Sequence, residues 1–176
     1  GTFKGKKLAT PKGRSLRPTS DKVREAFFDI FALKIDNAGF LDCFAGTGAM
    51  GLEALSRGAA SATLVEKARE AIGLIRQNAE MLGLEPEQIH EDFFDAAKKL
   101  GRQGRTFDLI YVDPPYRDPR KVEALELIDR SGLPAPDGTV IVEHVKKERM
   151  PESIGRLTLV DRRKYGGTAL SLYKIS

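Results

Sequence analysis

The chain of 176 residues is expected to fold as an α/β protein in which helices cover both faces of a mostly parallel sheet. Two observations predict this class. Segments of helical periodicity alternate with short apolar runs along most of the chain, as they do in strand–helix–strand units. Near the end of the chain, two strand-like runs are joined by Gly166 and Gly167, so the sheet is expected to close with an antiparallel hairpin.

Each expected element has its own signal. The first helix is predicted in DKVREAFFDIFALKI, residues 21–35, because apolar side chains recur there at helical spacing and Thr19 or Ser20 can cap its start. Short apolar runs predict strands, and the amphipathic stretches between them predict helices. In chain order, strands are expected at residues 39–44, 61–67, 88–93, 106–113, 138–145, 156–167 and 168–176, with further helices at residues 48–58, 69–83, 93–100 and 119–132.

The composition excludes several classes of protein. With 41% apolar and 31% charged residues the chain can bury a core, and its length suits one domain. No apolar run approaches the roughly 18 residues of a membrane span, and the start lacks the apolar core of a signal peptide, so a soluble, cytoplasmic protein is expected. Cys43 is the single cysteine and there are two histidines, so neither an internal disulfide nor a zinc site is expected.

The positive charge of the chain is concentrated at its start. Residues 1–24 carry eight basic side chains against one acid, a local charge of +7 in a chain whose net charge is +4. We therefore divide the sequence into a basic N-terminal hairpin or arm, residues 1–18, and a catalytic domain, residues 19–176. Cations among glycines and prolines suit the phosphates of a nucleic acid, and a solvated tail is an equal alternative. The candidate RNA-binding residues are Lys4, Lys6, Lys7, Lys12, Arg14, Arg17 and Arg24.

A glycine-rich turn follows the first expected strand. In LDCFAGTGAMG, Gly46, Gly48 and Gly51 have the G-x-G-x-x-G spacing of a nucleotide-binding turn. Glu66 ends the next strand about 20 residues later, where it can accept hydrogen bonds from ribose hydroxyls. This pattern suits NAD and S-adenosylmethionine equally, and a packed turn without a ligand is the alternative. Asp42 favours S-adenosylmethionine, because a carboxylate there would repel a pyrophosphate but attract an ammonium and a sulfonium.

The end of the third expected strand, HEDFFD, offers contacts to the adenine of such a cofactor. Asp92 can accept a hydrogen bond from an adenine amino group, and Phe93 can pack against the ring. The alternative is that Asp92 only caps the following helix. Together with the glycine turn, the predicted cofactor-binding residues are Asp42, Phe44, Ala45, Gly46, Thr47, Gly48, Gly51, Glu66, Lys67, Asp92 and Phe93.

The segment LIYVDPPY, residues 109–116, places an acid, two prolines and a tyrosine after the fourth expected strand. Methyl transfer to an exocyclic base nitrogen needs acceptors for the amino hydrogens, because the nitrogen lone pair is delocalised into the ring. The Asp113 carboxylate and the Pro114 carbonyl can be these acceptors, since proline fixes the torsion that aims the carbonyl. Tyr116 offers a face on which an extruded base can stack. The predicted catalytic residues are Asp113, Pro114, Pro115 and Tyr116, with a simple turn or helix start as the alternative.

Five segments of the chain occur together, in the same order, in one family of enzymes. They are RPTSDKVREAFFDIF, LDCFAGTGAMGLEALSRGA, VEK, VDPPY and VEHVKK. On these segments the chain resembles the bacterial 16S ribosomal RNA guanine-N2 methyltransferases, the small-subunit rRNA methyltransferase D family, across nearly its whole length. The glycine and DPPY motifs are shared with many methyltransferases, whereas RPTSDKVRE is much more specific.

The resemblance implies a seven-stranded class I, Rossmann-like methyltransferase fold with a small N-terminal β-hairpin that contacts RNA. It implies S-adenosylmethionine as the methyl donor and the N2 amino group of a guanine as the acceptor. The implied partner is ribosomal RNA in an assembled or nearly assembled small subunit, without a metal or a membrane, and a monomer is expected. Compared with the family, GTFKGKKL starts a few residues into the first strand.

Other functions stay open on the sequence alone. The chain could methylate N6 of adenine in DNA or RNA, or a protein glutamine, although it has no room for a separate DNA-recognition domain. Guanine is favoured because its N1–H and amino group are adjacent donors for one carboxylate. An NAD-linked oxidoreductase, or an RNA-binding module with an inactive cofactor pocket, is the alternative outside this class. If the arm is only a solvated tail, the RNA surface is expected around Arg117, Arg120 and Lys121.

Overall fold

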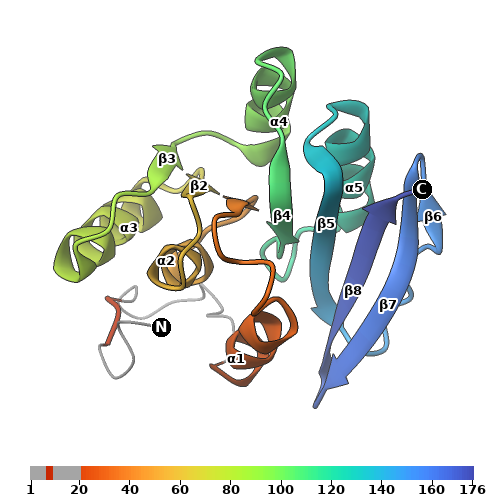
Figure 1. Ribbon diagram of the computed structural model, residues 1–176, viewed down its shortest axis with the longest axis horizontal. Coiled ribbons are helices and arrows are strands. Elements are labelled where there is room, and N and C mark those ends of the chain that lie inside the picture. Colours follow the sequence, from red (N-terminus) through yellow and green to blue (C-terminus); the bar gives the residue numbers. More distant parts are fainter. Residues whose placement is uncertain (1–6, 10–20) are drawn as a thin grey trace.

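Strands and helices alternate along residues 21–145 of the computed structural model, which describes residues 7–9 and 21–176 (Figure 1). The expected N-terminal hairpin, the domain boundary at residue 18 and the cap at Thr19 or Ser20 fall on residues that, apart from 7–9, lie outside this description. The helices are α1 (Asp21–Ile30), α2 (Ala49–Ser56), α3 (Arg69–Leu82), α4 (Phe93–Arg102) and α5 (Lys121–Arg130), and the strands are β1 (Gly39–Asp42), β2 (Ser61–Val65), β3 (Glu87–Ile89), β4 (Phe107–Val112), β5 (Pro134–Val145), β6 (Ser153–Ile154), β7 (Leu157–Tyr165) and β8 (Thr168–Ile175).

The sheet has the expected architecture. β1 pairs in parallel with β2 and β4, β2 with β3, and β4 with β5, while β8 joins β5 in antiparallel orientation. The strand order is β3-β2-β1-β4-β5-β8-β7-β6, and β7 and β8 form the expected hairpin around Gly166 and Gly167. The described chain has eight strands where the resemblance implies seven, because the two-residue strand β6 pairs with the start of β7 at the sheet edge. The predicted α/β class with a mostly parallel sheet is confirmed.

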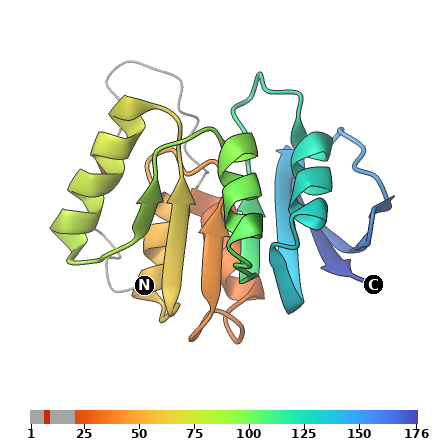
Figure 2. The same cartoon turned by 90° about the horizontal axis from the view of Figure 1, so that it is seen from above.

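Helices α1, α2 and α3 cover one face of the sheet, and α4 and α5 cover the other, as Figures 1 and 2 show from two directions. Each face therefore has its own core. On the first face, the Phe27 ring of α1 meets Phe40 of β1 and Tyr111 of β4 edge-on, with ring centroids 6.1 and 5.6 Å away. All three side chains are buried, and removing a ring of this size from a core costs about 3 to 5 kcal/mol. The first helix is thus fixed against the two strands that lead into the site.

The carboxyl ends of the parallel strands meet at one edge of the sheet. In the sheet register, Asp42 at the end of β1 lies opposite Leu64 of β2 and Tyr111 of β4, and Val112 lies opposite Val142 of β5. The segments that follow these strands therefore start side by side. Ligands of open α/β sheets bind at this edge, so the fold places the three sequence motifs where a ligand is expected.

Candidate functional site

A cleft of about 950 Å³, its open mouth included, lies at the carboxyl edge of the sheet. Its walls are the turn after β1, the ends of β2 and β3, and the loop after β4. The structure brings together in its lining every predicted cofactor-binding residue except Gly48 and Gly51, together with the four predicted catalytic residues: Asp42, Phe44, Ala45, Gly46, Thr47, Glu66, Lys67, Asp92, Phe93, Asp113, Pro114, Pro115 and Tyr116.

The turn after β1 needs glycine for its backbone. Gly46 and Gly48 have the left-handed conformation, with φ angles of 56° and 83°, and only Gly46 lines the cleft. Gly48 and Gly51 lie behind it. A Cβ on Gly48 would lie 3.1 Å from Cγ1 of Ile75, and a Cβ on Gly51 would lie 2.0 Å from Cδ2 of Leu64. These two glycines let α2 pack against α3 and β2. They affect a ligand only indirectly, by fixing the conformation of the turn.

Glu66, which follows β2, faces the glycine turn. Its Oε1 accepts a hydrogen bond from the backbone N–H of Gly46 at 2.9 Å, and its Oε2 accepts one from the N–H of Ala68 at 2.8 Å. Two backbone donors therefore fix the carboxylate at the cleft wall. A carboxylate can accept about four hydrogen bonds, so Glu66 keeps capacity for the two hydroxyls of a ribose.

Asp42 is buried at the base of the cleft, with 1% of its surface exposed. Its Oδ1 accepts a hydrogen bond from the backbone N–H of Phe44 at 3.2 Å. Burial raises the pKa of this carboxyl group to about 7, with smaller contributions from the nearby carboxylates of Glu66 and Glu143. A buried carboxyl group with neighbouring negative charges favours a cationic ligand, because a cation offsets both the desolvation and the repulsion.

Asp92 and Phe93 form another wall of the cleft at the start of α4. Asp92 is the N-cap of this helix, since its Oδ1 accepts a hydrogen bond from the N–H of Phe94 at 2.9 Å, and it also lines the cleft. Capping and cofactor binding, which the sequence presents as alternatives for Asp92, are therefore compatible. The buried Phe93 ring packs against Phe44, with centroids 5.3 Å apart and the rings tilted by 48°, so an apolar wall stands beside the carboxylate. This pairing suits a purine ring.

The loop after β4 carries the predicted catalytic residues into the mouth of the cleft. Asp113 is half-buried and Pro114 is buried, whereas Pro115 and Tyr116 are exposed. The Tyr116 side chain is 77% exposed, as a ring must be if it is to stack on an incoming base. The carbonyl of Pro115 accepts a hydrogen bond from the N–H of Asp118 at 2.8 Å, which turns the loop back toward α5.

Comparison with known proteins decides the family. A family model described as "Conserved hypothetical protein 95" matches residues 1–174. The chain belongs to this family. "Ribosomal RNA small subunit methyltransferase D" of Escherichia coli strain K12 is 35% identical over 174 residues, which cover 99% of this chain and 87% of that protein. The protein of the same name from Haemophilus influenzae is 30% identical over 179 residues, with 99% and 91% covered. A solved structure of a Thermus thermophilus hypothetical protein is 34% identical, has a TM-score of 0.83, and is matched over 96% of this chain and 92% of that one.

The matches confirm the resemblance that the sequence segments predicted, over residues 1–174 of this chain. They also agree with the fold, because a TM-score of 0.83 across 96% of this chain indicates that the two proteins share it. The cleft at the carboxyl edge of the sheet is therefore the candidate functional site of this family member.

Among the lining residues that the sequence did not predict for the cofactor or for catalysis are Asp118 and Arg120. Nε and Nη2 of Arg120 donate hydrogen bonds to the two carboxylate oxygens of Asp118, at 2.9 and 2.8 Å. The guanidinium lies 4.1 Å from the centroid of the Phe94 ring, and its hydrogen bonds lower the pKa of Asp118. The pair fixes the end of the catalytic loop against α4. An aspartate two residues before an arginine indicates no more than a turn in sequence, so no local signal could have found this role.

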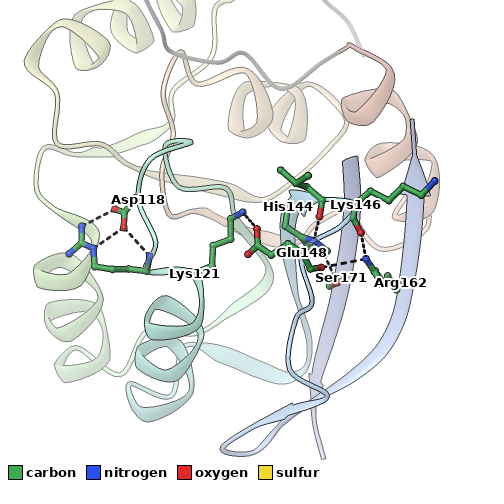
Figure 3. Close-up of polar contacts among 9 residues, drawn as sticks. Asp118, Lys121, His144, Lys146, Glu148, Arg162 and Ser171 are labelled. Atoms are coloured by element: carbon green, nitrogen blue, oxygen red, sulfur yellow. Dashed lines mark hydrogen bonds and ion pairs between the residues drawn. The ribbon is translucent and has the colours of Figure 1, made fainter. Parts of the chain in front are cut away.

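The alternative RNA surface around Arg117, Arg120 and Lys121 is largely engaged inside the protein. Arg120 is paired with Asp118, and Nζ of Lys121 donates to Oε1 of Glu148 at 2.9 Å (Figure 3). Arg117 is exposed and forms no ion pair with a described residue. As a group, these three side chains make a poor phosphate site.

Of the predicted arm residues, Lys7 is described and exposed, whereas Lys4, Lys6, Lys12, Arg14 and Arg17 lie outside the described residues. Arg24 of α1 forms a 3.0 Å ion pair with Asp21.

The fully buried side chain of Asn78 on α3 joins the described part of the arm to the glycine turn. Its Oδ1 accepts from the N–H of Ala9 at 2.6 Å, and its Nδ2 donates to the carbonyls of Ala9 and Thr47 at 3.2 and 3.1 Å. Sequence reasoning gave Asn78 no role, yet this amide fixes residue 9 directly beside the cleft.

Within residues 7–9 and 21–176, no group of three or more histidine, cysteine, aspartate or glutamate side chains could hold a metal ion. Over the same residues, no helix has the length and apolar character needed to cross a membrane.

Proposed function

We propose that this chain transfers the methyl group of S-adenosylmethionine to the N2 amino group of a guanine in small-subunit ribosomal RNA. The observation that carries the proposal is the loop after β4, which presents Asp113 and Pro114 at the mouth of a cleft whose remaining walls suit this cofactor. The names of the Escherichia coli and Haemophilus influenzae relatives support methylation of small-subunit rRNA.

The residues of the cleft fit S-adenosylmethionine group by group. The buried carboxyl group of Asp42 can pair with the ammonium of the cofactor. The Glu66 carboxylate can accept further hydrogen bonds from the ribose hydroxyls of the cofactor. Asp92 is an acceptor for the adenine amino group, and Phe93 lies behind it as an apolar wall. NAD fits less well, because its pyrophosphate would have to lie at the turn directly after the Asp42 carboxylate.

In the proposed mechanism the protein holds an amino group in the correct geometry and electrostatic field. When bound, S-adenosylmethionine supplies an electrophilic methyl group, whose bond to sulfur breaks as the nitrogen lone pair forms the new bond. The Asp113 carboxylate and the Pro114 carbonyl accept the two amino hydrogens, which withdraws the lone pair from the ring and directs it at the methyl group. Asp113 then takes the proton that the nitrogen must lose. Tyr116 stacks on the extruded base and excludes water from one face.

Guanine is the proposed base because of the donors on its pairing edge. Guanine presents N1–H and the amino group side by side, and a single carboxylate at Asp113 can accept from both. Adenine presents an acceptor at N1 next to its amino group, which a carboxylate would repel. N6-adenine methylation is therefore not favoured, and the rRNA methyltransferase names of the relatives speak against a protein glutamine.

The proposed substrate is rRNA in an assembled or nearly assembled small subunit, which places the activity in the cytoplasm, and the proposed enzyme is a monomer. We also propose that the basic arm binds RNA phosphates. The hydrogen bonds of Asn78 to Ala9 support this assignment, because they hold this residue of the arm beside the cleft.

The experiment that tests the proposed function combines ligand binding with methyl transfer. Calorimetry should detect binding of S-adenosylhomocysteine and no binding of NAD, since a ligand stabilises only a protein that binds it. Tritiated methyl transfer should label small subunits or their rRNA and leave DNA and large subunits unlabelled. Binding of NAD alone, or labelling confined to DNA or protein, would overturn the proposal.

Asp42 leads to a prediction about pH. If the cofactor ammonium binds the ionised carboxylate, the affinity for S-adenosylhomocysteine should fall as the pH drops below about 7, by up to about tenfold per pH unit. An Asp42→Asn variant should bind more weakly at pH 8 and lose this dependence. Calorimetric titrations from pH 6 to 9 would measure both effects. A wild-type affinity that stays constant across that range would contradict the role of Asp42.

The same carboxyl group should destabilise the ligand-free protein. Its pKa is raised from 3.8 to about 7 on folding, so its ionisation costs stability progressively as the pH rises between these values. Asp42→Asn is therefore expected to raise the thermal midpoint of the ligand-free protein at pH 8 and to lower its affinity for S-adenosylhomocysteine. A drop in both quantities would indicate a folding role instead.

A further inference from the structure

The C-terminal strands carry exposed cations that neither the arm nor the cleft includes. They are Lys146, Lys147 and Arg149 in the loop after β5 and Lys164 near the end of β7, here named the C-terminal patch. We propose that the C-terminal patch binds phosphates of the substrate RNA on the side of the cleft opposite to the arm. This proposal rests on the proposed function.

The sheet register places the C-terminal patch at the same edge as the catalytic loop. β5 runs parallel to β4, so the residues after Val145 leave the sheet at the edge where Asp113 follows β4. β8 and β7 run antiparallel to each other next to β5, with Thr168 opposite both Val145 and Tyr165. The end of β7, and Lys164 with it, therefore lies at this edge too.

Hydrogen bonds to β7 and to the turn between β7 and β8 hold the loop that carries three of these cations. Nη2 of Arg162 on β7 donates to the carbonyl of Lys146 at 2.5 Å, and the N–H of Lys146 donates to the carbonyl of Gly167 at 2.8 Å (Figure 3). Behind the loop, the ring nitrogens of buried His144 lie 2.7 Å from the Ser171 hydroxyl and 2.9 Å from the Val145 carbonyl. The loop is thus anchored to the C-terminal hairpin.

A second anchor connects this loop to the catalytic loop. Lys121, the first residue of α5, donates to Glu148 at 2.9 Å, and α5 directly follows the segment held by Asp118 and Arg120 (Figure 3). Two ion pairs, Arg120 with Asp118 and Lys121 with Glu148, therefore tie the chain between Asp113 and the C-terminal patch. Phosphates bound to the patch would lie at a fixed position relative to Asp113.

The charges of the C-terminal patch are available for a ligand. Its four cations form no ion pair with a described residue, whereas Lys99, Arg105 and Arg156 elsewhere on the surface each pair with an acid. The acids next to the patch are already bound: Glu148 accepts from Lys121, and Asp161 accepts from the side chain of Arg163. Because these cations form no ion pair with a described residue, a phosphate that binds them does not have to break one. The affinity then benefits fully from the release of counterions from the RNA.

The patch and Ala9, a described residue of the arm, lie on opposite sides of the cleft. Ala9 is bound to Asn78 of α3, which also binds Thr47 of the glycine turn, whereas the patch follows β5 and ends β7. Figure 1 shows α3 and β5 on opposite sides of β4. A base that reaches Asp113 carries a phosphodiester on each side of its nucleotide. Two basic surfaces on opposite sides would bind the RNA backbone on both the 5′ and the 3′ side of the target nucleotide. One arm alone could not do this.

The test compares two sets of three neutralised cations. The K146Q/K147Q/K164Q variant removes the lysines of the patch, and the control variant K34Q/R102Q/R130Q removes exposed cations at the opposite edge of the sheet. We expect the patch variant to bind small-subunit rRNA at least about tenfold more weakly than wild type. Its plot of log affinity against log salt should be shallower by about 2, since each lost phosphate contact changes the slope by about 0.7 to 0.9. The control should match wild type.

The affinity for S-adenosylhomocysteine and the rate at saturating RNA should stay within about twofold of wild type in both variants, because no cleft residue is changed. If the wild type methylates rRNA and the patch variant binds RNA with wild-type affinity and slope, the patch is only a solvated surface and this proposal is wrong. If the wild type neither binds nor methylates rRNA, the proposed function fails, and this proposal fails with it.

Discussion

Replacing Asp113 with alanine is expected to lower the rate of methyl transfer by about 100- to 1,000-fold, the range found when one preorganised partner of a developing charge is removed. Asp113 is expected to contact the amino group during transfer and to leave the cofactor untouched in the ground state. The loss should therefore appear in the rate at saturating substrates, while the dissociation constant of S-adenosylhomocysteine changes little. Single-turnover methyl transfer and calorimetry would measure the two quantities separately.

Asp137 supplies the matched control for this experiment. It is an acid whose side chain is 99% exposed, near the start of β5 at the opposite edge of the sheet. The Asp137→Ala variant should methylate at the wild-type rate, which separates the loss of Asp113 from a general effect of removing one negative charge. An Asp113→Ala enzyme within about threefold of wild type would remove Asp113 from the mechanism.

Glu66→Ala should produce the largest loss of cofactor affinity. Removing a charged hydrogen-bond acceptor from a cofactor site costs about 1 to 3 kcal/mol, equivalent to a dissociation constant about 5- to 150-fold higher. The N–H groups of Gly46 and Ala68 would also lose their acceptor, so the glycine turn should become less well fixed. The expected result is weak binding of S-adenosylhomocysteine with unchanged affinity for RNA.

Glu87 on β3 is a useful comparison for Glu66. Its carboxylate binds Arg105 and Thr63 at a distance from the cleft lining, so Glu87→Ala should leave cofactor binding unchanged. Equal affinities of the Glu66→Ala variant and the wild type for S-adenosylhomocysteine would mean that ribose does not lie at this wall. The proposed orientation of the cofactor would then have to be abandoned.

The elements of the fold and the three motifs could be predicted because their signals are local. A strand or helix is specified by the spacing of apolar residues within a short window, and parallel strands necessarily end at a common edge. Asp42 ends such a strand, and Glu66 and Asp113 each follow one, so their convergence on one cleft follows from the alternation of elements alone. Because the strands are parallel, these three residues meet at one edge of the sheet however far apart they lie in the sequence.

The parts of the site that could not be predicted depend on contacts between distant segments. Asn78 binds Ala9, 69 residues earlier, and Lys121 binds Glu148, 27 residues later, with no pattern that links either pair. The difference between Gly46 and Gly51 arises in the same way. The two glycines belong to one motif, and only the packing of Leu64 against α2 determines that the second one lies behind the cleft wall.

The nucleoside that carries the transferred methyl group tests the central claim most directly. Small subunits methylated with tritiated S-adenosylmethionine would be digested to nucleosides, and the labelled product identified by chromatography and mass spectrometry. The account predicts label in N2-methylguanosine of the small-subunit rRNA, accumulating about 100- to 1,000-fold more slowly when the Asp113→Ala variant is used. Label in N6-methyladenosine, in DNA or in protein would contradict the assignment of Asp113 as the acceptor for the two adjacent donors of guanine.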